Sequence, residues 1–191
     1  MGSYARSLCS LGVRLYGQAF DPKIASGERS HVDSVDPREE RRRTASPTRL
    51  PGHPEPGETF TIKVDPKNGG SSHLVFFIGD IAPGGAIHAH RHPNADEILF
   101  LQSGTARVHL GDSVRDIHAG STVFIPANTW ISVNNIGSDN ISMGTVFSAP
   151  GFEEFMRAGS VHEGEKNVPL TEAENDQIEK THLSDVIYKE P

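Results

Sequence analysis

The residues best suited to chemistry lie within residues 83–104, which read PGGAIHAHRHPNADEILFLQSG. His88, His90 and His92 alternate there, and Glu97 follows after a short polar gap. Because alternate residues of a β-strand point to one face of the sheet, the three imidazoles are expected to share a face. Imidazole together with carboxylate suits zinc, iron, manganese or nickel better than calcium. This stretch therefore predicts a divalent-metal site on a strand.

The composition of the chain limits its possible partners. The 191 residues are enough for one domain with a hydrophobic core, and they include 25 acidic and 18 basic residues, for a net charge of -7. Nucleic-acid binding relies on clustered Lys and Arg. One basic cluster, Arg41 to Arg43, directly follows Glu39 and Glu40, so we interpret it as a solvated charge run. We expect no nucleic-acid partner and a small-molecule substrate instead.

Cysteine content and hydropathy suggest where the protein works. Cys9 is the single cysteine, which excludes an intrachain disulfide and a cysteine-based zinc site and fits a reducing compartment. No apolar run approaches the roughly 18 residues of a membrane span. Arg6, Arg14 and several Gly and Ser interrupt the apolar residues of 1–20, which argues against a secretory signal. We expect a cytoplasmic protein without a membrane partner, with a transit-like N-terminal segment as the open alternative.

The chain divides into three segments of different character. Residues 1–57 are expected to be extended or disordered, because 21–57 combine six prolines with many charges and little hydrophobic periodicity. Residues 58–150 hold short apolar runs, separated by turn residues about every 8 to 12 positions, which predicts an all-β sandwich or barrel. The expected strands are 59–65, 73–81, 84–92, 97–101, 105–110, 114–118, 121–125, 130–135 and 141–148.

Residues 151–191 are expected to form short helices. Phe152, Phe155 and Met156 share one helical face, and Gly159 would end that helix. The sequence Thr171-Glu-Ala-Glu174 fits a capping box, which would open a second helix that continues to about His182. Its apolar face is thin, so this helix should pack on the barrel or on a partner.

The histidine stretch resembles the first motif of the cupin superfamily. That motif reads G, five residues, HxH, three or four residues, E, six residues, G. Gly84, His90, His92, Glu97 and Gly104 occupy its fixed positions. All fixed positions are matched, in a segment that independently reads as strands, so the resemblance is specific.

The second cupin motif, G, five residues, PxG, two residues, H, three residues, N, is matched only in part. Gly120, Pro126 and Asn135 stand at their positions, Asn128 replaces the glycine, and Ile131 replaces the histidine. Asparagine, like glycine, can take the positive φ of a turn. Isoleucine, in contrast, cannot coordinate a metal, so the family's fourth ligand is missing here.

Over roughly residues 58–150, the resemblance implies the jelly-roll β-barrel of a small single-domain cupin, with a site inside one open end. It implies that His90, His92 and Glu97 bind one divalent metal ion, either Fe, Mn, Ni or Zn. Two His and one carboxylate leave coordination positions open, as in non-haem Fe(II) oxygenases or an open zinc site. The alternative is a barrel that kept the motif and lost the metal.

Residues around the expected metal suggest a substrate pocket. His88 is expected beside the metal as a catalytic acid–base or substrate-binding group, and the alternative is an ordinary strand histidine. The residues that alternation turns inward would make the pocket largely apolar, which favours a small organic molecule with one chelating polar end. These pocket residues are Leu99, Leu101, Ile125, Ile131, Val133 and Asn135.

Two functions from different classes fit these features. The first is a metal-dependent enzyme, either a dioxygenase-like oxidoreductase or an isomerase or lyase, acting on a small organic substrate. The alternative is a non-catalytic module that binds a small ligand, with a structural metal or none. We favour the enzyme. Ile98 and Phe100 should point outward from their strand, so a homodimer is expected, unless a terminal segment covers this face.

Overall fold

The computed structural model describes residues 43–45, 59–68, 70–166, 168 and 170–189. All of these residues belong to one unit of the chain, residues 35–191. Nearly all of the segment expected to be extended or disordered, residues 1–57, lies outside the described residues. The exception is the short strand β1. Among the helices of the described residues, none has the length and apolarity needed to cross a membrane.

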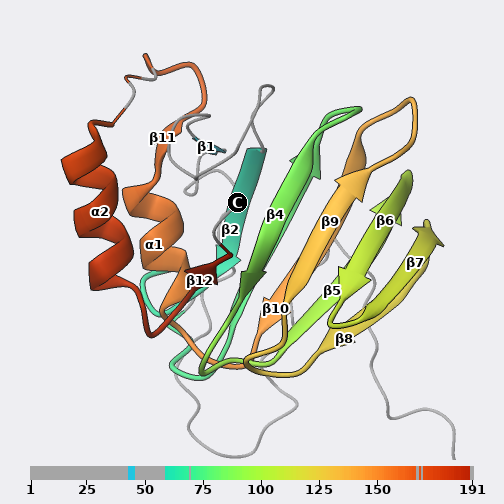
Figure 1. Cartoon of the computed structure of the whole chain (residues 1–191). Coiled ribbons are helices and arrows are strands. Elements are labelled where there is room, and N and C mark those ends of the chain that lie inside the picture. Colours follow the sequence, from blue (N-terminus) through green and yellow to red (C-terminus); the bar gives the residue numbers. More distant parts are fainter. Residues whose placement is uncertain (1–42, 46–58, 69, 167, 169, 190–191) are drawn as a thin grey trace, which may run out of the picture. The chain divides into compact units, whose positions relative to one another are not determined.

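Two antiparallel sheets build the domain (Figure 1). The first has seven strands in the order β11-β1-β2-β3-β10-β5-β8, and the second has five in the order β12-β4-β9-β6-β7. The strands are β1 (Arg43–Ala45), β2 (Thr59–Val64), β3 (Val75–Ile81), β4 (Ala86–Arg91), β5 (Glu97–Ser103), β6 (Thr105–Leu110), β7 (Ser113–His118), β8 (Thr122–Ile125), β9 (Ile131–Asn135), β10 (Ile141–Phe147), β11 (Ser160–His162) and β12 (Ile187–Tyr188).

The predicted all-β class is confirmed. Every strand predicted between residues 59 and 148 is present, as β2 to β10, with ends that differ by at most a few residues. Three strands were not predicted, namely β1, β11 and β12. Each of these is two or three residues long, too short for an alternating pattern to show in the sequence.

Two hydrophobic clusters hold the layers together. The first lies between the sheets and includes Ile81, Leu99, Leu101, Val108, Ile125, Ile131, Val133, Ile141 and Met143. The second joins the first sheet to the C-terminal part of the chain and includes Phe60, Ile62, Val75, Phe77, Phe147, Phe155, Met156 and Val186. Burying one such side chain stabilises the folded state by about 1.5–3 kcal/mol relative to leaving it exposed, so both clusters contribute to the stability of the fold.

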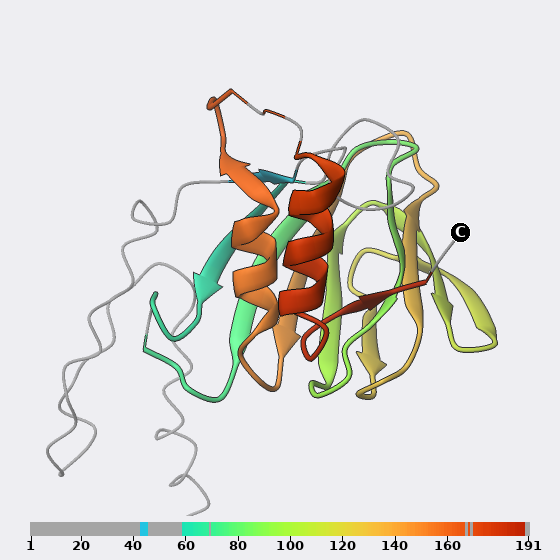
Figure 2. The same ribbon diagram turned by 60° about the vertical axis from the view of Figure 1, so that its left-hand side comes forward.

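Two helices follow the barrel strands, and they lie side by side (Figure 2). Helix α1 (Phe152–Ala158) places Phe155 and Met156 in the second cluster. An ion pair between Arg157 of α1 and the fully buried Asp65 ties this helix to the end of β2. Helix α2 (Glu172–Thr181) opens with the predicted capping box, in which Thr171 and Glu174 bond reciprocally.

The second-motif residues build turns that hold the strands in place. Asn128, at the motif's glycine position, has a φ of 63°, the left-handed conformation that Gly and Asn tolerate best. Its backbone N–H donates to the carbonyl of His92 at 2.7 Å. The departure from glycine therefore keeps the turn geometry, and this turn supports one of the metal-ligand candidates.

Asn135 lies buried beside a turn, where all of its amide atoms are used. Its Nδ2 donates to the carbonyls of Ile81 at 2.9 Å and Asp139 at 2.8 Å. Its Oδ1 accepts from the backbone N–H of Gly137 at 2.9 Å. These bonds connect the ends of β3 and β9 with the turn before β10.

Replacing Asn135→Ala should lower the free energy of unfolding by about 2 kcal/mol, because one buried and two part-buried backbone groups lose their partner. The adjacent Asn134→Ala is a matched control: Asn134 is half-buried, and the change should cost less than about 0.5 kcal/mol. Chemical denaturation of both variants measures the difference. Equal unfolding free energies would show that the amide network does not stabilise the fold.

Candidate metal centre

Three side chains that can bind a metal meet inside the barrel. His90 lies on β4, His92 directly follows this strand, and Glu97 opens β5. Their candidate ligand atoms all lie within 4.8 Å of one another. All three residues are buried, with 6%, 3% and 6% of their surface exposed, respectively. The structure thus brings together the three metal ligands that the cupin resemblance implies.

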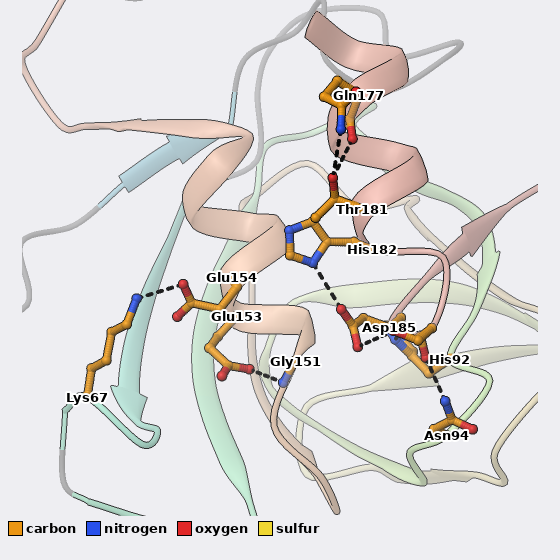
Figure 3. A network of polar contacts seen from close by, with 11 residues as sticks. Lys67, His92, Asn94, Gly151, Glu153, Glu154, Gln177, Thr181, His182 and Asp185 are labelled. Carbon is orange, nitrogen blue, oxygen red and sulfur yellow. Dashed lines mark hydrogen bonds and ion pairs between the residues drawn. The ribbon is translucent and has the colours of Figure 1, made fainter.

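Backbone carbonyls fix the orientation of both imidazoles. His90 Nδ1 lies 2.7 Å from the carbonyl oxygen of His88, and His92 Nδ1 lies 2.7 Å from that of Asp185 (Figure 3 shows the second contact). A carbonyl only accepts hydrogen bonds, so Nδ1 of each ring must carry the hydrogen. The lone pair is then on Nε2, the arrangement typical of metal-binding histidines.

The residues fit a cation by their chemistry as well as by their positions. His92 Nε2 is buried without a hydrogen-bond partner, and it lies 3.8 Å from Glu97 Oε2. Leaving a buried nitrogen lone pair unsatisfied costs about 1–3 kcal/mol. A metal ion at this position would satisfy it, and two nitrogens with one carboxylate are donors that suit Fe, Mn, Ni or Zn.

The apolar surroundings keep the two imidazoles neutral. The ring of His92 packs against both Phe147 and Phe152, with ring centroids 4.7 Å and 4.6 Å away. Burial, together with the nearby His90, lowers the pKa of His92 to about 3. Burial also lowers the pKa of His90 to about 4. Both rings are therefore ready to bind a metal at neutral pH without first losing a proton.

A β-bulge changes the strict alternation expected for the histidines. Ile87 pairs with Val133 and His90 pairs with Ile131, so two residues of β4, His88 and Ala89, stand against a single residue of β9. Ile87 and His90 consequently both line the interior cavity, although they are three positions apart. His88 is not among the lining residues, and its carbonyl rather than its ring contacts His90.

The cavity beside His90 and Glu97 has a volume of about 50 Å³ and is mostly apolar. Of the predicted pocket residues, Leu99, Ile131 and Val133 line it. Leu101 and Ile125 instead pack in the first hydrophobic cluster, and Asn135 belongs to the turn network described above. The full lining comprises Phe60, Phe77, Gly79, Ile87, His90, Glu97, Leu99, Ile131, Val133, Met143, Thr145, Phe147, Phe152, Met156 and Tyr188.

The C-terminal part of the chain contributes lining residues that were not predicted. Phe152 and Met156 come from α1, and Tyr188 comes from β12. The helical spacing of Phe152 and Met156 signalled a buried face, although nothing in it pointed to the cavity. For Tyr188, on a strand of two residues, the sequence carries no signal.

Residues 77–147 are similar to a known protein family. The family model for the cupin domain matches residues 77–147, the segment from β3 to β10 that contains both motifs. The chain therefore contains a cupin domain in this segment. The match includes His90, His92 and Glu97, and it ends before the C-terminal helices.

The individual proteins that this chain resembles are only distantly similar to it in sequence. The uncharacterized protein YrkC of Bacillus subtilis (strain 168) is 30% identical over 78 residues, which are 38% of this chain and 40% of YrkC, so the match spans less than half of that relative. The structure of a predicted oxalate decarboxylase from Thermotoga maritima superposes with a TM-score of 0.53 at 18% identity, covering 61% of this chain and 98% of that chain. This likeness shows the cupin fold alone. For the BH2720 protein of Bacillus halodurans, the TM-score is 0.41 at 25% identity, with 41% of this chain and 64% of that chain covered.

The lowered pKa values of His90 and His92 predict how the metal-free protein responds to acid. Below pH 6.5 the unfolded chain binds protons on both imidazoles while the folded protein does not, until the pH approaches 4 for His90 and 3 for His92. The free energy of unfolding should therefore be constant above pH 6.5 and fall as the pH drops, by up to about 1.4 kcal/mol per pH unit for each ring.

Thermal melts of the metal-free protein between pH 8 and pH 5 check this expectation. The double variant His90→Asn/His92→Asn, which lacks both titrating rings, should show a flatter profile than the wild type over the same range. Superimposable pH profiles for the two proteins would contradict the prediction.

Proposed function

We propose that this cupin is a metal-dependent enzyme that acts on a small organic substrate at a centre formed by His90, His92 and Glu97. The observation that carries the proposal is the buried Nε2 of His92, which has no hydrogen-bond partner and faces the Glu97 carboxylate at 3.8 Å. A histidine kept only for packing would gain by turning a donor towards a carboxylate. Here the donor nitrogen is instead held away, by the Asp185 carbonyl.

Two imidazoles and one carboxylate favour iron, manganese, nickel or zinc as the bound ion. When bound, such an ion supplies a Lewis acid and, in the case of iron or manganese, a redox partner. Ile131, opposite His90 in the sheet, stands where the family has a further histidine, and its side chain cannot bind a metal. Open positions of this kind favour a dioxygenase-like oxidation, with a metal-assisted isomerase or lyase reaction as the second type.

The cavity walls define the kind of substrate. Apolar side chains such as Ile87, Leu99 and Val133 exclude water and bind a carbon skeleton, while Thr145 and Tyr188 add hydroxyl-bearing side chains to the lining. A volume of about 50 Å³ is small for a ligand site in this conformation. We therefore propose a substrate of few heavy atoms, with one polar end that reaches the centre.

Metal binding tests the proposal directly. Wild-type protein purified without a histidine tag should take up about one equivalent of Fe(II), Mn(II), Ni(II) or Zn(II). His90→Ala should weaken binding by more than the roughly 10–100-fold that loss of an outer-shell partner costs. His88→Ala is the matched control, because it removes a histidine of the same strand that lies outside the ligand cluster, and it should keep the metal.

Elemental analysis and metal titration of the three proteins measure these differences, and oxygen uptake with small acids and enols then screens for turnover. Equal metal content in the wild type and His90→Ala would show that the ion is held elsewhere. Absence of binding for all four ions would favour the non-catalytic ligand-binding module.

We also propose that the protein forms a homodimer through the outer face of the first sheet. A cross-strand row on this face consists of Phe124, Ile98, Val146 and Phe76, and the next row of Thr122, Phe100, Gly144 and Ile78. Three of these apolar side chains are strongly exposed, with 57% for Phe124, 44% for Ile98 and 42% for Phe100. The two rows contain no charged residue, so they are complementary to a second copy of themselves in a two-fold arrangement.

Phe124→Asp should weaken dimerisation at least tenfold, because a two-fold interface would bring both new charges into one apolar contact. Val114→Asp is the matched control, since Val114 is 48% exposed but lies on β7 of the other sheet. Light scattering and sedimentation over a concentration series measure the association. A wild-type monomer at high concentration, or a dimer that Phe124→Asp leaves intact, would contradict this proposal.

A further inference from the structure

The last described part of the chain, His182–Lys189, is here named the C-terminal strap. It begins with a turn, in which the N–H groups of Asp185 and Val186 both donate to the carbonyl of His182. It continues as β12, which pairs with β4 so that Tyr188 stands opposite His90. The N–H of Lys189 donates to the carbonyl of Ala89 at 2.8 Å. In Figure 2 the strap runs from the lower end of α2 across to the second sheet.

The strap contacts both histidines of the proposed centre. The Asp185 carbonyl accepts the hydrogen of His92 Nδ1 at 2.7 Å, across 93 positions of sequence. The ring of Tyr188 lies 5.6 Å from the ring of His90, and the same side chain lines the cavity. A segment outside the cupin motifs thus sets the surroundings of two candidate ligands.

Several contacts hold the Asp185 carbonyl in place (Figure 3). Asn94, in the loop between the two ligand-bearing segments, donates from Nδ2 to the Ser184 carbonyl at 3.0 Å. The Asp185 carboxylate pairs with His182 Nδ1 at 2.9 Å. Val186 is only 4% exposed and packs in the second hydrophobic cluster. The strap is therefore anchored on both sides of the carbonyl that reaches His92.

We propose that Asp185 is a positioning residue of the metal centre, whose backbone carbonyl holds His92 as the Nδ1–H tautomer with Nε2 directed to the metal position. A neutral imidazole carries its hydrogen on either nitrogen, and only the Nδ1–H form leaves Nε2 free to bind. Docking of the strap selects that form. By thermodynamic linkage, metal binding must then stabilise the docked strap by the same factor by which the strap strengthens metal binding.

This inference rests on the proposed metal centre and adds a requirement to it: the motif residues alone do not make the site. Without the strap, His92 would lose the bond that fixes its tautomer, and His90 would lose the aromatic ring against its face. Outer-shell partners of metal-binding histidines typically contribute 10–100-fold to metal affinity.

Point variants in the full chain test the role of the strap. Asp185→Ala removes the ion pair with His182, and Asn94→Ala removes the bond to Ser184, so both loosen the turn that carries the carbonyl. Each should weaken Zn(II) binding about tenfold or more. Leu183→Ala is the matched control, because Leu183 lies in the same turn and is 54% exposed, and it should bind Zn(II) like the wild type.

A spectroscopic readout separates positioning from a general loss of stability. Long-range ¹H–¹⁵N correlation spectra of the metal-free protein report which ring nitrogen of His92 carries the hydrogen. The wild type and Leu183→Ala should show the Nδ1–H form, whereas Asp185→Ala and Asn94→Ala should show a growing share of the Nε2–H form. An unchanged tautomer together with unchanged Zn(II) affinity would overturn the inference.

Hydrogen exchange of the unmodified protein is a second test that needs no variant. Saturating Zn(II) should slow exchange of the Lys189 amide about tenfold, with little change in β7 on the far edge of the second sheet. Equal rates at Lys189 with and without bound Zn(II) would overturn the linkage. If the wild type binds no Zn(II), the proposed function fails instead, and the tautomer of His92 in the metal-free protein still tests the positioning role.

Discussion

Keeping two neutral imidazoles inside an apolar barrel is the constraint on which the site depends. Burial lowers the pKa of both rings, to about 4 for His90 and about 3 for His92, and each ring then needs an acceptor for its single hydrogen. Backbone carbonyls provide those acceptors, one from within β4 and one from Asp185. As a consequence the Nε2 of His92 is left without a hydrogen-bond partner inside the barrel. The proposed metal ion would satisfy this buried nitrogen.

The fold meets this constraint with two local irregularities. The bulge in β4 places His90 on the cavity face together with Ile87, and it brings the His88 carbonyl within reach of the His90 ring. The left-handed turn at Asn128 then bonds to the backbone of His92 just after the strand ends. In a regular strand the backbone carbonyls bond to neighbouring strands, so the His88 carbonyl would not be available to the His90 ring. The irregular positions are therefore part of the site and not defects of the sheet.

The sequence predicted the strands and the cluster of three candidate ligands because both leave periodic or spaced signals. Alternation located β2 to β10, and the fixed spacing of the first motif located His90, His92 and Glu97. The alternation also predicted that His88 shares a face with His90 and His92. The bulge changes this arrangement, and one extra residue in a strand leaves no signal in the composition. Leu101 and Ile125 are buried as expected, yet they do not line the cavity, because an inward direction does not say at which depth of the barrel a side chain lies.

The C-terminal strap shows why the rest of the site could not be predicted from the sequence. Its contacts with the centre run through backbone atoms, such as the Asp185 carbonyl, which every residue type carries equally. The register of β12 against β4 puts Tyr188 on one side of His90, while the register of β9 puts Ile131 on the other. One flank of His90 thus carries an isoleucine that cannot bind a metal, and the opposite flank carries a phenol ring that lines the cavity. The surroundings of this histidine are set jointly by a motif that the sequence displays and by a tertiary contact that only the fold reveals.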